Sequence, residues 1–143
     1  MTTYISDPSG DALDVVGRAL AVIADLGAPA DDLGALLAPG YVLVEHPNAL
    51  RPQGRVATRA EALASFTAGR SLLAEQRLDV HELVAQGAAV AVRATWHGIL
   101  ATAFPGLPAG GALQAEVAQF LTVRDGLLVR QETFDCYASL PAI

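Results

Sequence analysis

Two long runs of apolar and β-branched residues near the C-terminal end of the chain are separated by a short turn sequence. The first run covers residues 114–123 and the second covers residues 127–137, with Asp125-Gly126 between them. Asp-Gly between two such runs is a strong local signal of a β-hairpin. The second run also carries polar residues where a sheet interior is expected, and burying unpaired polar groups costs free energy. We therefore expect this strand to form the floor of a functional site.

The composition fits one domain with a real core and excludes several classes of function. Hydrophobic residues make up 52% of the 143 residues, and charged residues make up 17%. The net charge is −6 and the basic residues are scattered, so nucleic acid and anionic membranes are poor partners. All nine basic residues are arginine. Lysine-dependent chemistry, such as Schiff-base catalysis, is therefore excluded.

The N-terminal residues and the cysteine content indicate the cellular compartment in which the protein is expected. The first residues lack the basic and apolar segments of a signal peptide, and the single cysteine, Cys136, cannot form an internal disulfide. The longest apolar run near the N-terminus, residues 19–24, is too short to span a bilayer. We expect a cytoplasmic protein.

Helices are predicted in the first half of the chain. Residues 1–10 are polar and end in Pro-Ser-Gly, so we expect a flexible N-terminal arm followed by a single domain over residues 11–140. Apolar residues at three- and four-residue spacing predict a helix that begins at Asp11. Asp31 or Asp32 can cap a second, short helix.

Strands dominate the second half. Residues 41–46 are predicted to form a strand, and Thr58 and Glu61 match a capping box for a third helix over residues 59–74. The rest of the chain is predicted to form four strands, over residues 77–85, 88–102, 112–123 and 127–137. Helices followed by antiparallel strands are typical of an α+β domain whose helices pack on one face of a curved sheet.

This order of elements resembles a known superfamily. Val44-Glu45-His46-Pro47 closes the first strand, and VRDGLLVRQETFDCY closes the sheet. With these segments, residues 11–138 resemble the nuclear transport factor 2-like superfamily, and within it the SnoaL-like polyketide cyclases and the ketosteroid isomerases. The resemblance implies a cone-shaped, curved antiparallel sheet wrapped around three helices, with a small-molecule pocket open at one end. It also implies a homodimer formed through the outer face of the sheet.

The resemblance further implies catalytic residues. In ketosteroid isomerase the general base is an aspartate in a strand-end V-E-D-P segment, and His46 stands at that position. The two oxyanion-binding positions of that enzyme fall on Ala19 and Ala118, so its mechanism is not expected here. In SnoaL-like cyclases and their epoxide-opening relatives, an aspartate late in the last strand is the acid/base. The matching residue is Asp135.

Alternation along the strands extends the candidate pocket. Every second residue from Gln131 to Tyr137 shares one face of the last strand, and the resemblance places that face inside. The same counting places Trp96 on the pocket wall, and Glu116 and Phe120 on the strand beside it. The expected substrate-binding residues are Trp96, Phe66, Phe120, Tyr41, Gln131, Thr133 and Glu116.

Each catalytic candidate has a structural alternative. His46 suits proton transfer because the usual pKa of an imidazole lies near neutral pH, but it can equally be a strand-end histidine bonded to a loop carbonyl. Asp135 is costly to bury as a free anion, and the alternative is an ion pair with Arg93 or Arg55. A His46–Asp135 contact would form a catalytic dyad, and no spacing in the sequence shows that the two residues meet.

Glu116 and the histidines are of residue types that are often functional, and each has a structural interpretation. Glu116 is a reserve carboxylate whose alternative is an exposed sheet position. The three histidines form no close-spaced pair typical of a zinc site, so no metal is expected.

We therefore expect a cofactor-independent enzyme that uses general acid/base chemistry on an apolar, oxygenated small molecule of polyketide- or terpenoid-like character. Proton abstraction next to a carbonyl, leading to cyclisation or isomerisation, is the preferred reaction class, and epoxide hydrolysis is the next. The alternative is a non-catalytic module of the same fold that binds a ligand or dimerises. Alanine at both oxyanion positions favours that alternative, because a base without charge stabilisation gives little acceleration.

Overall fold

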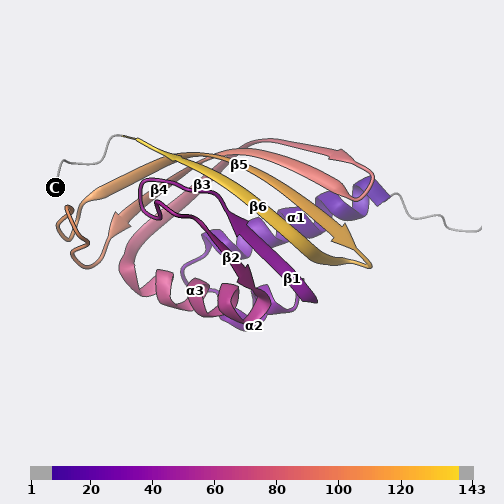
Figure 1. Ribbon diagram of the computed structural model, residues 1–143, viewed down its shortest axis with the longest axis horizontal. Helices are drawn as coiled ribbons and strands as arrows, with labels where there is room; N and C mark the ends of the chain where they lie inside the picture. Colours follow the sequence, from indigo (N-terminus) through magenta and orange to yellow (C-terminus); the bar gives the residue numbers. More distant parts are fainter. Residues whose placement is uncertain (1–7, 139–143) are drawn as a thin grey trace, which may run out of the picture.

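The predicted hairpin lies in the middle of a six-stranded sheet (Figure 1). The computed structural model describes residues 8–138. Its elements, in chain order, are α1 (Pro8–Ala24), α2 (Ala30–Gly34), β1 (Leu37–Glu45), β2 (Arg55–Thr58), α3 (Arg59–Leu72), β3 (Leu73–Gln86), β4 (Ala89–Leu100), β5 (Ala112–Arg124) and β6 (Leu127–Tyr137). The strand order is β2-β1-β6-β5-β4-β3. The α+β fold with a curved sheet around three helices, as the sequence predicted, is confirmed.

The β5–β6 hairpin turns through two residues in the left-handed conformation. Asp125 has a φ of 53° and Gly126 a φ of 75°. Positive φ at both central residues gives the turn whose twist matches that of the flanking strands, which explains why Asp-Gly is used here. β6 then pairs antiparallel with β5 and parallel with β1, while the other neighbouring strands are antiparallel. The hairpin thus joins the early strand β1 to the late strands of the sheet.

The N-terminal helix is longer than the sequence predicted. α1 begins at Pro8, because proline is tolerated in the first turn of a helix, where its missing N–H has no helical partner. The prediction that this helix begins at Asp11 is therefore wrong, and the helix includes residues 8–10. Residues 1–7, the rest of the expected arm, lie outside the described residues.

The region between the first helix and β1 also differs from the prediction. α2 is preceded by Pro29 without a side-chain cap, so the expected cap by Asp31 or Asp32 is wrong. The helix ends at Gly34, and β1 already begins at Leu37. Proline and glycine at positions 39 and 40 therefore lie inside the strand, where a register shift interrupts its pairing with β6. Proline lacks an N–H for the ladder and is accepted at such irregularities.

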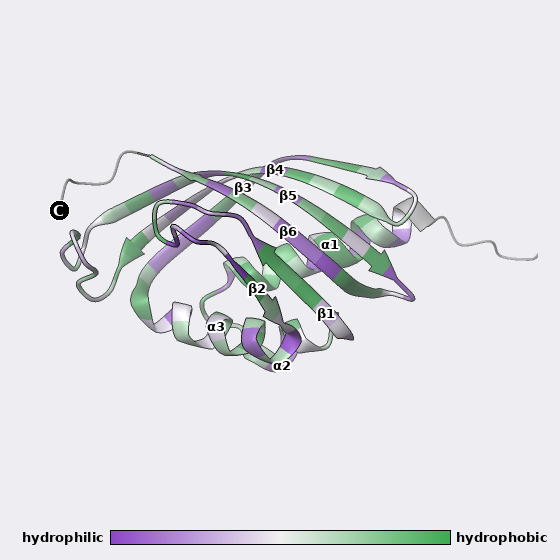
Figure 2. Cartoon of the chain, in the orientation of Figure 1, coloured by the Kyte–Doolittle hydropathy of each residue, from purple (hydrophilic) through white to green (hydrophobic). Residues whose placement is uncertain are grey.

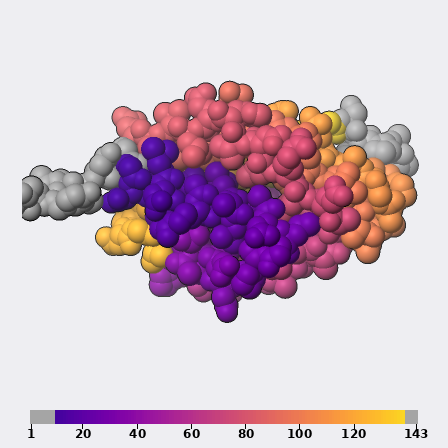
Figure 3. Space-filling model, turned by 180° about the vertical axis from the view of Figure 1, so that it is seen from behind, coloured from indigo at the N-terminus to yellow at the C-terminus, as the bar shows by residue number. Residues whose placement is uncertain are grey.

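The helices cover the concave face of the sheet. α1 buries Val16 and Ala19 completely, in one core cluster with Leu121 of β5 and Leu128 of β6. Figure 2 shows hydrophobic and hydrophilic bands along the long strands, as expected when one face of a sheet is buried. Seen from the opposite side, the N-terminal third of the chain covers the centre and the lower part of the molecule (Figure 3). None of the described helices is long and apolar enough to cross a membrane.

The capping box predicted for α3 is confirmed. Glu61 N–H donates a hydrogen bond to Thr58 Oγ1 (3.2 Å), and Thr58 N–H donates one to Glu61 Oε1 (3.0 Å). We expect Thr58→Ala to lower the free energy of unfolding by about 1 kcal/mol, because a helix N–H loses its partner. Chemical denaturation with an unchanged m-value measures this change. Thr67→Ala, at an exposed position inside the same helix, should be neutral or slightly stabilising, and equal losses in both variants would contradict the capping role.

Candidate active site

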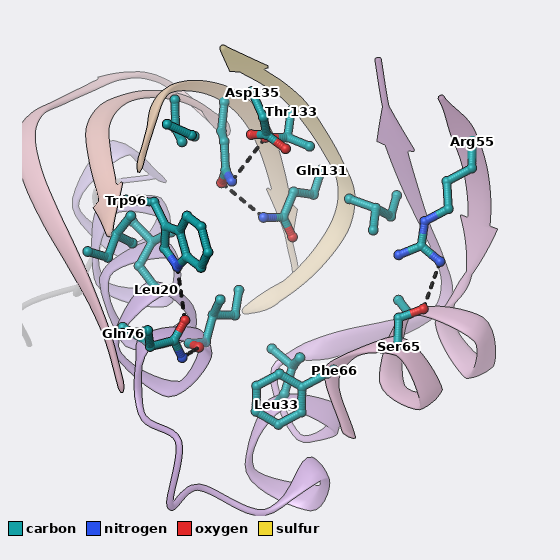
Figure 4. Close-up of a pocket in the computed structure, with 18 of the residues that line it drawn as sticks. Leu20, Leu33, Arg55, Ser65, Phe66, Gln76, Trp96, Gln131, Thr133 and Asp135 are labelled. Carbon is teal, nitrogen blue, oxygen red and sulfur yellow. Dashed lines mark hydrogen bonds between the residues drawn. The ribbon is translucent and has the colours of Figure 1, made fainter. Parts of the chain in front are cut away.

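A cavity of about 310 Å³ lies between the concave face of the sheet and the helices (Figure 4). Each of the described helices and strands contributes at least one side chain to its lining. Most of the wall is apolar, with Leu20 from α1, Phe66 from α3, Leu78 from β3 and Val117 from β5. A concave pocket with a mostly apolar wall and a few fixed polar groups is typical of a small-molecule site.

A chain of hydrogen bonds runs across the sheet floor of this cavity. Tyr41 Oη donates to Gln131 Oε1 (2.8 Å), and Gln131 Nε2 donates to Gln119 Oε1 (2.9 Å). Gln119 Nε2 donates to Thr133 Oγ1 (3.3 Å), and Thr133 Oγ1 donates to Asp135 Oδ1 (2.7 Å). Every donor in the chain points toward Asp135. The carboxylate is therefore the terminal acceptor of a network that crosses β1, β6 and β5.

The environment of Asp135 favours its neutral form more than water does. Burial raises the pKa of the Asp135 carboxyl, the hydrogen bond from Thr133 lowers it, and the negative charge of Glu45 raises it. The net result is a pKa above the usual aspartate value. Among the described residues, no hydrogen bond is found to the second carboxylate oxygen, Oδ2. This oxygen is available to a ligand in the cavity.

Tyr137 follows Asp135 on the same face of β6 and lines the same cavity. Burial, and next the negative charge of Asp135, raise the pKa of the Tyr137 hydroxyl above its usual value. The phenol therefore stays protonated around neutral pH and can donate a hydrogen bond. The Trp96 ring meets the Tyr137 ring edge-on, with centroids 6.4 Å apart and an interplanar angle of 82°.

Trp96 is held in place from two sides. Its Nε1–H donates to Gln76 Oε1 (3.0 Å), and Gln76 Nε2 donates to the carbonyl oxygen of Ile23 (2.9 Å). A Cβ on Gly98 would lie 2.4 Å from the indole, so this position has to be glycine for the ring to lie where it does. The orientation of the indole is thus fixed before any ligand binds.

Arg55 and Ser65 form a second polar region of the cavity, on the side away from Trp96 (Figure 4). Arg55 Nη1 donates to Ser65 Oγ (2.7 Å), and Arg55 Nε donates to Glu45 Oε1 (3.3 Å). Glu45 also lies 3.4 Å from Arg51 Nε. The expected alternative of an ion pair between Asp135 and Arg55 or Arg93 is not what the structure shows, because Arg55 pairs with Glu45 and Arg93 with Glu82.

His46 does not meet Asp135. Its Nε2 lies 2.7 Å from Glu132 Oε2, and its ring stacks on Phe134 with centroids 4.0 Å apart. Glu132 and Phe134 alternate with Thr133 and Asp135 along β6, so they lie on the outer face of the sheet. The predicted His46–Asp135 dyad is therefore wrong, and the partner of His46 is a carboxylate and not the loop carbonyl of the alternative.

Glu116 and Phe120 are also on the outer face. Glu116 Oε2 accepts a hydrogen bond from Thr95 Oγ1 (2.9 Å), and Phe120 packs edge-on against Phe134. The prediction that both line the pocket is wrong. The inner face of β5 carries the alternate residues, and one of them is Gln119. The apolar residues Leu113, Ala115, Val117, Leu121 and Val123 share that parity, and this pattern in the sequence identifies the buried face.

The other predicted pocket residues do line the cavity. They are Trp96, Phe66, Tyr41, Gln131, Thr133 and Asp135. The expected substrate-binding set omitted Gln119, Arg55 and Ser65, of which Arg55 belongs to the unpredicted strand β2. Tyr137 was predicted to share the inward face of the last strand but was not counted among the substrate-binding residues, and it lines the cavity. No group of three or more His, Cys, Asp or Glu side chains that could hold a metal ion is found within residues 8–138.

Comparison with protein families and solved structures gives consistent results. The sequence profile of the SnoaL-like domain family matches residues 16–131. No curated protein matches the chain. A SnoaL-like protein from Jannaschia sp. CCS1 superposes with a TM-score of 0.73 at 20% identity, covering 94% of this chain and 91% of the other.

Two further structures share the fold. IdmH from Streptomyces antibioticus, a candidate polyketide cyclase, has a TM-score of 0.69 at 23% identity and covers 87% of this chain and 91% of its own. An LEH-like epoxide hydrolase from M. tuberculosis has a TM-score of 0.70 at 17% identity, with coverage of 94% and 83%. At sequence identities this low, the similarity to these structures shows a shared fold alone.

The raised pKa of Asp135 predicts how stability depends on pH. Above the usual aspartate pKa of about 4, the unfolded chain ionises more readily than the folded one, so the carboxyl group of Asp135 destabilises the fold at neutral pH. Asn keeps an acceptor for Thr133 and removes this charge. We expect Asp135→Asn to have an equal or higher Tm at neutral pH, and the difference to vanish below about pH 4. Calorimetry across pH measures this, and a clearly lower Tm at neutral pH would assign Asp135 a structural role.

Proposed function

Because the chain belongs to the SnoaL-like domain family, we propose that it is a cofactor-independent enzyme that performs general acid/base chemistry on a small, apolar, oxygen-containing molecule. The supporting observation is the carboxyl group of Asp135. It is partly buried in an apolar cavity, held through one oxygen by Thr133, and has a pKa above its usual value because of burial. A carboxylate with a raised pKa accepts a proton more readily than an aspartate in water does.

The proposed step is removal of a proton from a carbon next to a carbonyl group. Asp135 Oδ2 accepts the proton, and the electron pair of the C–H bond moves to the carbonyl oxygen as an enolate. Tyr137, two residues further along the same face, donates a hydrogen bond to that oxygen. In cyclisation, the enolate carbon adds to a second carbonyl carbon of the same molecule, the C=O π bond of that carbonyl breaks, and its oxygen takes the proton back from Asp135. In isomerisation of an unsaturated ketone, the intermediate is a dienolate, and Asp135 returns the proton to the carbon at its far end.

The structural neighbours support this choice of reaction class. One of them is a candidate polyketide cyclase and another is an LEH-like epoxide hydrolase. A cyclase or isomerase needs one acid/base group beside an oxyanion donor, which Asp135 and Tyr137 supply. Epoxide hydrolysis, in which Asp135 would activate a water molecule, is the next reaction class.

A non-catalytic ligand-binding module is the competing function. Ala19 is completely buried in the core and Ala118 lies in the outer-face register opposite Phe134, and neither side chain can donate a hydrogen bond. The oxyanion donors of ketosteroid isomerase therefore have no counterpart at these positions. Tyr137 is the residue on which the catalytic proposal depends for charge stabilisation.

Deuterium exchange tests the proposal without knowledge of the natural substrate. We expect the protein to accelerate exchange of the protons next to the carbonyl of 2-tetralone in D₂O, measured by NMR. Asp135→Asn should reduce the acceleration about a hundredfold or more, because it removes the base. Asp125→Asn, in the β5–β6 turn, is the matched control and should keep full activity. Binding of 2-tetralone without exchange would favour the binding module.

We also propose that a second copy of the chain covers the outer face of the sheet. Phe120 and Phe134 are 51% and 37% exposed there and pack against each other. Arg130 and Glu132 lie beside them, with side chains 3.7 Å apart, and offer charges of both signs. An apolar patch flanked by both charges is self-complementary, as a two-fold interface requires.

The state of association tests this interface. We expect the protein to be a dimer in light scattering after size exclusion, and Phe120→Glu to shift it to monomer because like charges would face each other in an apolar contact. Ala64→Glu adds the same charge at an exposed position of α3 and should leave the dimer intact. A monomeric wild-type protein, or dimers in both variants, would rule out this interface.

A further inference from the structure

Arg55 is held at the cavity wall in a conformation suited to binding an anion. We propose that its guanidinium anchors a carboxylate, or a comparable anionic oxygen group, at one end of a ligand whose apolar body fills the cavity. This inference rests on the proposed function of the cavity as a ligand site, and it adds the chemical class of the ligand. Figure 4 shows the guanidinium extending from its strand toward Ser65 of α3.

The Arg55 guanidinium is held in place by hydrogen bonds, but not all of its N–H donors are used. Ser65 Oγ accepts from Nη1 and Glu45 Oε1 accepts from Nε, and the Arg55 side chain is only 22% exposed. A guanidinium has five N–H donors in one plane. No hydrogen bond from Nη2 is found to any residue that the structure describes. The remaining donors therefore have a defined direction, and a ligand meets a group whose conformation is already set.

The single negative charge of Glu45 does not balance its two arginine partners. Glu45 is shared between Arg55, at 3.3 Å, and Arg51, at 3.4 Å. One carboxylate therefore faces two guanidinium groups. Glu45 also accepts a hydrogen bond from Asn48 (3.1 Å), so it keeps partners when a ligand takes up some of the Arg55 donors. An anion is thus stabilised without leaving Glu45 unpaired.

The rest of the lining separates this positive region from the acid/base group. Arg55 and Asp135 are the two charged side chains of the described lining, and Phe66 and Trp96 are among the apolar groups that complete it. A ligand with its anionic end on Arg55 presents an apolar body to these rings. The ligand class is a small carboxylic acid with a compact hydrocarbon part.

Fluorescence of Trp96 gives a direct test, because it is the single tryptophan of the chain and lines the cavity. The probes are 4-cyclohexylbutanoate and its neutral amide, which do not absorb where tryptophan is excited. At neutral pH we expect the carboxylate to bind about tenfold or more tightly than the amide. Arg55→Gln should abolish this preference while leaving amide binding unchanged.

Two further variants make the result specific. Arg51→Gln removes the same charge from the same cluster but does not line the cavity, and it should keep most of the preference. Asp135→Asn should retain carboxylate binding, so a failure of the acid/base proposal is seen in deuterium exchange and not here. Equal affinity for both probes, no binding of either, or an equal loss in Arg51→Gln and Arg55→Gln would overturn the proposal.

Discussion

Burial of polar side chains on the concave face of β6 is the constraint on which the site depends. Gln131 and Thr133 are almost fully enclosed, and a buried amide or hydroxyl without partners costs free energy. One series of hydrogen bonds satisfies these groups, and it links Tyr41, Gln131, Gln119, Thr133 and Asp135. Among the described residues, no buried side-chain nitrogen or oxygen lacks a hydrogen-bond partner. An ionised carboxylate can only accept, so Asp135 fixes the direction of every hydrogen bond in this series. The same hydrogen bonds therefore hold the carboxylate of Asp135 in position and satisfy the buried polar groups of the sheet floor.

The sequence predicted those features that local chemistry determines. The Asp125-Gly126 turn, the bounds of β6 and the capping box of α3 each depend on residues that are close in the chain. The overall fold followed from the order of helices and strands, with the help of the resemblance. The start of α1 and the short strand β2 were not predicted, because proline in a first helical turn resembles a loop and a four-residue strand between turns has almost no periodicity.

The errors at the site have one physical origin. Alternation shows which residues of a strand share a face, but a shift of one residue exchanges the two faces. His46 was aligned with a catalytic position, yet the neighbouring Glu45 interacts with Arg55 at the cavity while His46 packs on Phe134 outside. On β5, Glu116 was also assigned to the wrong face, although the alternating apolar residues of that strand mark the opposite face as the buried one.

The same alternation allows one sheet to serve two proposed roles. Along β6, Thr133 and Asp135 project into the cavity, while Glu132 and Phe134 project outward beside Phe120. The backbone of the sheet separates the side chains of the two faces. The residues on one face can therefore differ in chemical character without affecting contacts on the other face. His46 illustrates the consequence. Its backbone N–H bonds to the carbonyl of Thr133, so it helps to hold the strand that carries Asp135, while its imidazole belongs to the proposed interface. The contribution of His46 to function is therefore expected through assembly and strand position, whereas the proposed proton chemistry depends on Asp135.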